Sequence, residues 1–155
     1  MKYYNDIRDL IGNTPILKLN NISTKEGVNI YAKIEGTSPG GSCKDRVGIY
    51  MVEKAEKEGK LKSGSTIIEA TAGNTGIGIA LAAINKGYKI IFIVPNKFSI
   101  EKQKIMKALG AEIINTPKEE GMEGAINLAN SLLSEIPNSL SLNQFKNEAN
   151  PSPLL

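Results

Sequence analysis

A glycine-rich segment delivers one lysine to the start of a predicted helix. Residues 39–46 read Pro-Gly-Gly-Ser-Cys-Lys-Asp-Arg, so the lysine is Lys44. Glycines let the backbone turn tightly, and a helix N-terminus offers unpaired N–H groups and a local positive potential. That potential and the charge of Arg46 would favour the neutral, nucleophilic form of the Lys44 amine. Such an amine can form a covalent link to a carbonyl carbon, in a substrate or in pyridoxal phosphate. A lysine after a glycine turn is also common as a solvated helix start.

A second segment, residues 71–76, has the side chains and position of an anion site. It reads Thr-Ala-Gly-Asn-Thr-Gly and lies between a predicted strand, 66–70, and a nearly all-apolar predicted helix, 77–84. Open α/β sheets bind ligands beyond the carboxyl ends of their strands. Backbone N–H groups, two threonine hydroxyls and the Asn74 amide could together hold a carboxylate or a phosphate. The alternative is that the glycines only permit close helix packing.

The composition limits which chemistry these segments can perform. The chain has 155 residues, which is enough for one domain with one sizeable core. It contains no histidine, and this excludes Ser-His and Cys-His nucleophile pairs and most zinc sites. We therefore predict no metal site and expect the chemistry to depend on lysine, hydroxyl, carboxylate or amide groups or on a cofactor.

The charge and cysteine content bear on partners and location. The 19 lysines and arginines are spread along the chain and aromatic residues make up 5%, whereas a nucleic-acid surface needs clustered arginines and stacking rings. No apolar run is long enough to span a membrane, and the N-terminus lacks the apolar core of a signal peptide. One cysteine cannot form an internal disulfide. We expect a cytoplasmic protein that contacts neither nucleic acid nor membrane.

The apolar pattern predicts alternating strands and helices. Strands are expected at 16–19, 28–35, 66–70, 88–94 and 111–115, with a last one around Leu140 and Leu142; helices are expected at 7–11, 44–58, 77–84, 99–109 and 122–133. The continuous β-branched run at 88–94 is typical of a central strand covered on both faces. The alternation implies crossover connections and a three-layer α/β sandwich with a mostly parallel sheet.

A nucleotide-binding loop is an alternative explanation of the glycine-containing segment at 71–78. The 71–78 segment is close to the glycine loop of short-chain dehydrogenases, and Tyr50 with Lys54 forms a Tyr-x-x-x-Lys pair. In those NAD(P)-binding enzymes the glycine loop comes first and the tyrosine pair far downstream, which is the reverse of the order here. Ala72 replaces a glycine, and no acidic residue follows the strand at 88–94 to bind a ribose. This alternative is therefore disfavoured.

Four ordered motifs resemble one enzyme family. They are Ile-Gly-Asn-Thr-Pro at 11–15, the lysine segment at 39–46, the loop at 71–76 and Asn-Gln-Phe at 143–145. Together they are similar to the cysteine synthase and cystathionine β-synthase family of pyridoxal-phosphate enzymes, which implies the tryptophan-synthase-β-like fold. Residues 97–103 and Ala72 favour the bacterial branch that joins O-acetylserine to homocysteine.

The resemblance implies roles for individual residues. Lys44 would hold the cofactor and then take the substrate α-proton as the catalytic residue, and Asn74 would hydrogen-bond the phenolic oxygen of the cofactor. The substrate carboxylate would be bound by residues of both later motifs: Thr71, Ala72, Gly73, Asn74, Thr75 and Gln144. The implied transferase or lyase replaces the β-leaving group of O-acetylserine or serine with sulfide or a thiol such as homocysteine, giving cysteine or cystathionine.

The resemblance covers the N-terminal half of a family member. The family's loop for the cofactor phosphate lies beyond residue 155, so we expect the isolated chain to be impaired. Residues about 45–145 would form the small mobile substrate-binding subdomain, and residues 1–40 would pack on the C-terminal half, which leaves Ile7, Leu10, Leu17 and Leu19 uncovered in this chain. The family implies a homodimer, with a complementing C-terminal chain as a possible partner. The alternative is a non-catalytic fragment that binds a partner chain or a small anionic amino acid.

Overall fold

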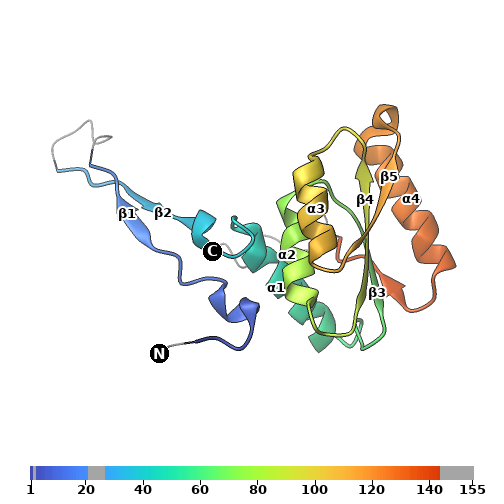
Figure 1. Cartoon of the computed structure of the whole chain (residues 1–155), viewed down its shortest axis with the longest axis horizontal. Coiled ribbons are helices and arrows are strands. Elements are labelled where there is room, and N and C mark those ends of the chain that lie inside the picture. The colour runs from blue at the N-terminus through green and yellow to red at the C-terminus, as the bar shows by residue number, and fades with distance from the viewer. Residues whose placement is uncertain (2, 21–26, 144–155) are drawn as a thin grey trace.

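A parallel sheet of four strands, in the order β5-β4-β3-β6, lies at the centre of the computed structural model (Figure 1). The structure describes residues 1, 3–20 and 27–143. The strands are β3 (Thr66–Ala70), β4 (Lys89–Pro95), β5 (Glu112–Thr116) and β6 (Ser139–Leu140). The chain proceeds outward from β3 to β5 and then returns to pair β6 with the other side of β3. The sheet therefore has a topological switch point between β3 and β6, where open α/β sheets bind ligands.

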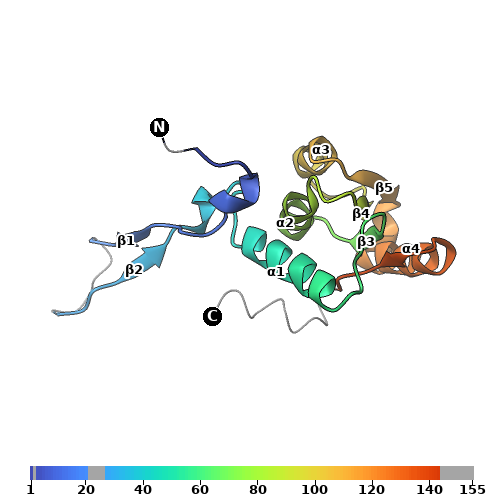
Figure 2. The ribbon, with the colours of Figure 1, turned by 90° about the horizontal axis from the view of Figure 1, so that it is seen from below.

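Helices cover both faces of this sheet, as Figures 1 and 2 show. The helices α1 (Lys44–Lys57), α2 (Asn74–Ala83) and α3 (Ile100–Ala108) lie on one face. The helix α4 (Gly121–Glu135) lies on the other, after the short 3-10 turn η3 (Lys118–Glu120). The predicted three-layer α/β sandwich with a parallel sheet is confirmed.

The layers follow from the alternation of side chains along the strands. Ile67 and Phe92 belong to a core cluster with apolar residues of α1 and α2, whereas Ile68 and Ile93 pack with Ala125 of α4. Successive strand residues point to opposite faces, so one strand feeds both clusters. Every residue of α2 after Asn74 is buried, because α2 lies on the sheet between α1 and α3. Its nearly all-apolar sequence thus has a simple explanation in packing.

The N-terminal part of the chain forms an arm that extends away from the sheet in both views (Figures 1 and 2). It contains the 3-10 turn η1 (Ile7–Leu10), the antiparallel pair β1 (Ile16–Lys18) and β2 (Tyr31–Lys33), and the turn η2 (Glu35–Thr37). The alternation at 28–35 predicted a longer, half-buried strand, and this was wrong in extent and burial. Only residues 31–33 pair with β1, and within the described ranges no second layer covers the pair.

Candidate functional site

The crossing of α1 and α2 brings the lysine segment against the start of α2. A Cβ placed on Gly78 would lie 2.2 Å from the carbonyl oxygen of Lys44, and one on Gly48 would lie 2.2 Å from the carbonyl oxygen of Gly78. The two helix backbones therefore touch, which only glycine allows. Gly78 lies about one helical turn after Asn74. The two predicted chemical segments, distant in sequence, are thus neighbours in the structure.

The helix α2 begins earlier than its apolar pattern predicted, at Asn74 instead of residue 77. The N–H groups of Gly76 and Ile77 already donate to the carbonyl oxygen of Gly73, at 3.1 and 3.5 Å. Among the described residues, no acceptor is found for the backbone N–H groups of 72–75. Four N–H donors at the positive end of a helix form a binding site suited to an anion.

Two buried threonines border these donors. Thr71 is 2% exposed and Thr75 is 7% exposed, and neither hydroxyl has a hydrogen-bond partner among the described residues. The Thr71 side chain lies against the first turn of α2, with its Cγ2 atom 2.8 Å and its Oγ1 atom 3.4 Å from the position that a Cβ on Gly76 would occupy. The two hydroxyls are therefore available to contact a ligand held by the N–H groups.

The glycines around this loop differ in whether close packing requires a residue without a Cβ atom. A Cβ on Gly76 would lie 2.6 Å from the Sδ atom of Met106, and Gly78 meets the backbone of α1. For these two glycines, close packing is confirmed as the reason for the residue type. A Cβ on Gly73 would meet only the Nζ atom of Lys102, at 3.9 Å. The packing interpretation thus explains the helix and leaves the loop open to a ligand.

A buried carboxylate fixes the turn before Lys44. Asp45 is fully buried, and its Oδ2 atom accepts a hydrogen bond of 2.6 Å from the N–H of Gly40. A Cβ on Gly40 would lie 2.3 Å from the Asp45 Oδ1 atom, and Gly41 has a φ of 74°, in the left-handed region that favours glycine. Burial raises the pKa of Asp45, the Gly40 hydrogen bond opposes that change, and Glu35 adds to it. The glycine pair therefore lets the turn close onto Asp45.

Arg46 is paired with a carboxylate that the sequence analysis did not assign to it. Its Nε atom lies 2.9 Å from a carboxylate oxygen of Glu35, and its terminal nitrogen donates to the Thr14 hydroxyl at 3.1 Å. The hydrogen bond from Arg46 is the main reason that the pKa of Glu35 is lowered. Glu35 balances the charge that was expected to act on Lys44, and Arg46 instead joins α1 to the segment 11–15. This contact joins the motif at 11–15 to the motif at 39–46.

Glu69 was missed in the sequence and holds the two sides of the switch point together. It is 6% exposed on β3, and its Oε1 atom accepts hydrogen bonds from the Ser141 hydroxyl at 2.9 Å and the Asn143 N–H at 2.5 Å. Asn143 is therefore fixed near the carboxyl end of β3, next to the loop at 71–76. Gln144, predicted to bind the substrate carboxylate, lies outside the described residues. The sequence signal that could have indicated Glu69 was a single charged residue in an otherwise uncharged strand.

The free energy of unfolding should depend on pH because the Glu69 carboxyl group is buried. Burial raises the pKa of Glu69, against the opposing effects of the Asn143 and Ser141 hydrogen bonds. Its contribution to stability is thus fully present below the unfolded pKa and is lost as pH rises through the higher folded pKa. In urea unfolding from pH 4 upward, wild type should lose stability relative to Glu69→Gln. Glu53→Gln, at an exposed site on α1, is the control. If the free energies of unfolding of wild type and Glu69→Gln changed with pH in parallel, the raised pKa of Glu69 would be contradicted.

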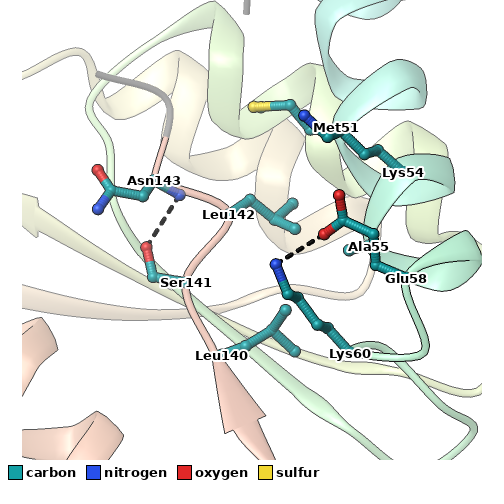
Figure 3. A pocket seen from close by; sticks show the side chains of 9 residues that line it. All are labelled: Met51, Lys54, Ala55, Glu58, Lys60, Leu140, Ser141, Leu142 and Asn143. Atoms are coloured by element: carbon teal, nitrogen blue, oxygen red, sulfur yellow. Dashed lines mark hydrogen bonds and ion pairs between the residues drawn. The ribbon is translucent and has the colours of Figure 1, made fainter. Parts of the chain in front are cut away.

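A cavity of about 260 Å³ lies between α1 and the chain after β6 (Figure 3). Met51, Ala55, Leu140 and Leu142 supply its apolar lining, and its polar residues are Lys54, Glu58, Lys60, Ser141 and Asn143. An ion pair of 2.7 Å joins Lys60 to Glu58. None of the predicted site residues that the structure describes lines this cavity, because it borders the later turns of α1 and not its beginning. It is therefore separate from the site around Lys44.

Two further findings concern the described residues as a whole. No group of three or more His, Cys, Asp or Glu side chains in residues 1, 3–20 and 27–143 could hold a metal ion. No helix in that part of the chain is long and apolar enough to cross a membrane.

Comparison with solved structures supports the fold. The chain is similar to the O-acetylserine dependent cystathionine β-synthase from Helicobacter pylori, with a TM-score of 0.89 and 48% identity over 99% of this chain and 51% of that one. It is also similar to the cysteine synthase from Entamoeba histolytica, with a TM-score of 0.92 and 41% identity over 98% of this chain and 46% of that one. The predicted pyridoxal-phosphate enzyme fold is confirmed.

Sequence comparison gives the same family. The O-acetylserine dependent cystathionine β-synthase of Bacillus subtilis (strain 168) is 57% identical over 152 residues, which are 98% of this chain and 50% of that protein. The chain spans about half the length of the curated relatives it matches. The family model described as "Pyridoxal-phosphate dependent enzyme" matches residues 7–152. This chain therefore belongs to the family of pyridoxal-phosphate dependent enzymes.

Proposed function

We propose that this chain supplies the cofactor lysine and the substrate-carboxylate site of a β-replacement enzyme. The observation that supports the proposal is the contact between the backbones of Lys44 and Gly78, because Gly78 belongs to the helix whose first turn carries the four unpaired N–H groups. The proposed reaction replaces the leaving group of O-acetylserine or serine with sulfide or a thiol such as homocysteine. Relatives named cysteine synthase and O-acetylserine dependent cystathionine β-synthase support this choice.

The residues present fit pyridoxal phosphate at one end of the cofactor. Lys44 is half-buried at the start of α1 and would be attached to the aldehyde carbon. Asn74, at the start of α2, would donate to the phenolic oxygen. When bound, the cofactor supplies an electron sink for negative charge at the substrate α-carbon. Once released from the cofactor, the Nζ atom of Lys44 would take the proton from that carbon.

The substrate carboxylate would lie at the N-terminus of α2. The N-H groups of residues 72–75 would donate to its oxygens, and the unpartnered hydroxyls of Thr71 and Thr75 would add two shorter contacts. Gln144 would approach the same carboxylate from the chain that follows Asn143, whose N–H is held by Glu69. These donors orient the α-carbon toward Lys44 before the proton is moved.

The N-terminal arm would complete its burial on the C-terminal half of the enzyme. Ile16 is 67% exposed, Leu17 55% and Tyr31 60%, and Ile7 and Leu10 are also exposed. A surface of this kind on one arm is suited to a partner. We propose that residues 1–40 pack there and that residues about 45–145 form the substrate-binding subdomain. The cofactor-phosphate loop of the family belongs to that half, so this chain alone would hold the cofactor weakly.

Reduction of the chain with borohydride in the presence of pyridoxal phosphate tests the proposal. The reduction makes any link between an amine and the aldehyde permanent, and peptide mapping by mass spectrometry then locates it. We expect the label at Lys44, and less of it when O-acetyl-L-serine is added first, because the substrate amine competes for the aldehyde. A label spread over exposed lysines such as Lys104 and Lys107, with none enriched at Lys44, would contradict the proposal.

A further inference from the structure

The side chain of Lys102 lies over the loop that carries the four unpaired N–H groups. A Cβ placed on Gly73 would lie 3.9 Å from the Lys102 Nζ atom. Lys102 stands in the first turn of α3, where its own N–H donates to the Ser99 hydroxyl that caps the helix. The ammonium group therefore comes from a different element than the loop, and the helix cap fixes the position of its backbone.

The surroundings of Lys102 leave its charge available. In residues 27–143 and the described part of the arm, no carboxylate lies within ion-pairing distance of its Nζ atom, and no acceptor is hydrogen-bonded to it. Lys102 is half-buried, whereas Lys104 and Lys107 of the same helix are exposed. Thr71, which is 2% exposed, has its Oγ1 atom 3.4 Å from the Cβ position of Gly76, in the first turn of α2. A cation, a hydroxyl and four N–H donors thus lie around the same loop and first helical turn without an anion from the described residues.

We propose that Lys102 is the cation that pairs with the carboxylate bound at residues 71–75 and makes the site selective for a full negative charge. Backbone N–H groups and hydroxyls can also donate to the carbonyl oxygen of an amide or ester, although a carboxylate accepts stronger hydrogen bonds. An ammonium group in a half-buried site adds a Coulomb attraction that a neutral ligand lacks. The ligand class is therefore a free amino acid with an ionised α-carboxylate. This inference rests on the proposed function, because it concerns the same anion.

Titration of the ¹⁵N-labelled 155-residue chain with acetate, without added cofactor, tests the role of Lys102. Acetate should shift the amide signals of Gly73, Asn74 and Thr75, and its neutral analogue acetamide should shift them only at much higher concentration. Lys102→Met should weaken acetate binding roughly tenfold. Lys102→Arg should retain most of it. Lys104→Met, which removes the same charge from an exposed site on α3, should change the affinity by less than about twofold.

Ionic strength separates a direct charge contact from an effect on folding. Acetate binding to wild type should weaken as salt rises, and binding to Lys102→Met should depend less on salt. Amide spectra of the variants outside the loop should match wild type, and Lys102→Gln provides a second neutral variant if the methionine perturbs α3.

The outcomes distinguish this inference from the proposed function. Equal acetate affinity in wild type and Lys102→Met would overturn it, as would an equal loss in Lys104→Met. The absence of loop shifts with acetate in wild type would overturn it together with the carboxylate site. A Lys102-dependent acetate site in a chain whose Lys44 is not labelled by pyridoxal phosphate would support the anion site and reject the proposed enzyme function.

Discussion

Replacing Gly78 with alanine is expected to destabilise the fold by at least about 3 kcal/mol. The new methyl group would lie 2.2 Å from the carbonyl oxygen of Lys44 and 2.8 Å from its carbonyl carbon. Both are backbone atoms, so no side chain can rotate to make room. The two helices would have to separate, and buried contacts of Val47 and Met51 with α2 would be weakened. Gly48→Ala should act in the same way, because its methyl group meets the backbone of Gly78.

The loss of stability expected from the Gly78→Ala clash has to exceed the gain in helix propensity that alanine brings. Alanine stabilises a helix relative to glycine by about 1 kcal/mol, so a solvent-exposed glycine in a helix would improve on substitution. Overpacking against backbone outweighs that gain here, and a loss of 3 kcal/mol is a large fraction of the 5–15 kcal/mol that stabilises a typical domain.

Urea unfolding followed by far-ultraviolet circular dichroism measures the effect. Gly36→Ala is the matched control, because a Cβ there meets no atom within 4 Å and the residue lacks a positive φ. The control should change the free energy of unfolding by less than about 1 kcal/mol. Stability of Gly78→Ala equal to that of the control would show that α1 and α2 do not touch at this point, and the placement of Lys44 beside the loop would lose its support.

Replacing Lys44 with alanine is expected to abolish the specific cofactor label and to lower β-replacement activity by at least about a thousandfold. Alanine has no amine to attach to the cofactor aldehyde and none to take the substrate α-proton. Activity would be measured on this chain joined to the C-terminal half of the Bacillus subtilis relative, with O-acetyl-L-serine and either sulfide or homocysteine. The fold should be preserved, because the contact with Gly78 is made by the backbone of residue 44.

Two controls make the Lys44 experiment specific. Lys57→Ala removes an exposed lysine from the other end of α1 and should leave both the label and the activity unchanged. The comparison of sulfide with homocysteine identifies the second substrate, since both assays use the same chimera. Retention of full activity by Lys44→Ala would reject Lys44 as the catalytic residue.

The outcome of Lys44→Ala also bears on the Lys102 inference. The acetate site at residues 71–75 requires no amine at position 44, so a folded Lys44→Ala variant should still show loop shifts with acetate that depend on Lys102. Charge selection and cofactor attachment would then be separate properties of the same site.

Much of the fold could be predicted from local patterns. The strand at 66–70 was placed with its observed bounds, the helix after residue 43 began where expected, and the cap at Ser99 was identified. These features depend on side-chain periodicity and on capping groups within a few residues of one another. The two segments that carry Lys44 and residues 71–76 were recognised for the same reason, since glycine turns and helix starts are local.

The sequence by itself determined which groups this protein has for chemistry, and only the tertiary structure decided how they are paired. The charge of Arg46 was expected to act on the Lys44 amine because the two residues are near in the chain, but Arg46 forms an ion pair with Glu35. Glu69 joins Asn143 across 74 residues, and Lys102 approaches Gly73 from another helix. The physical reason is that hydrogen bonds and ion pairs depend on distances of a few ångströms in space. Those distances are set by how α1, α2 and α3 pack on the sheet, and a pattern read along one chain does not contain them.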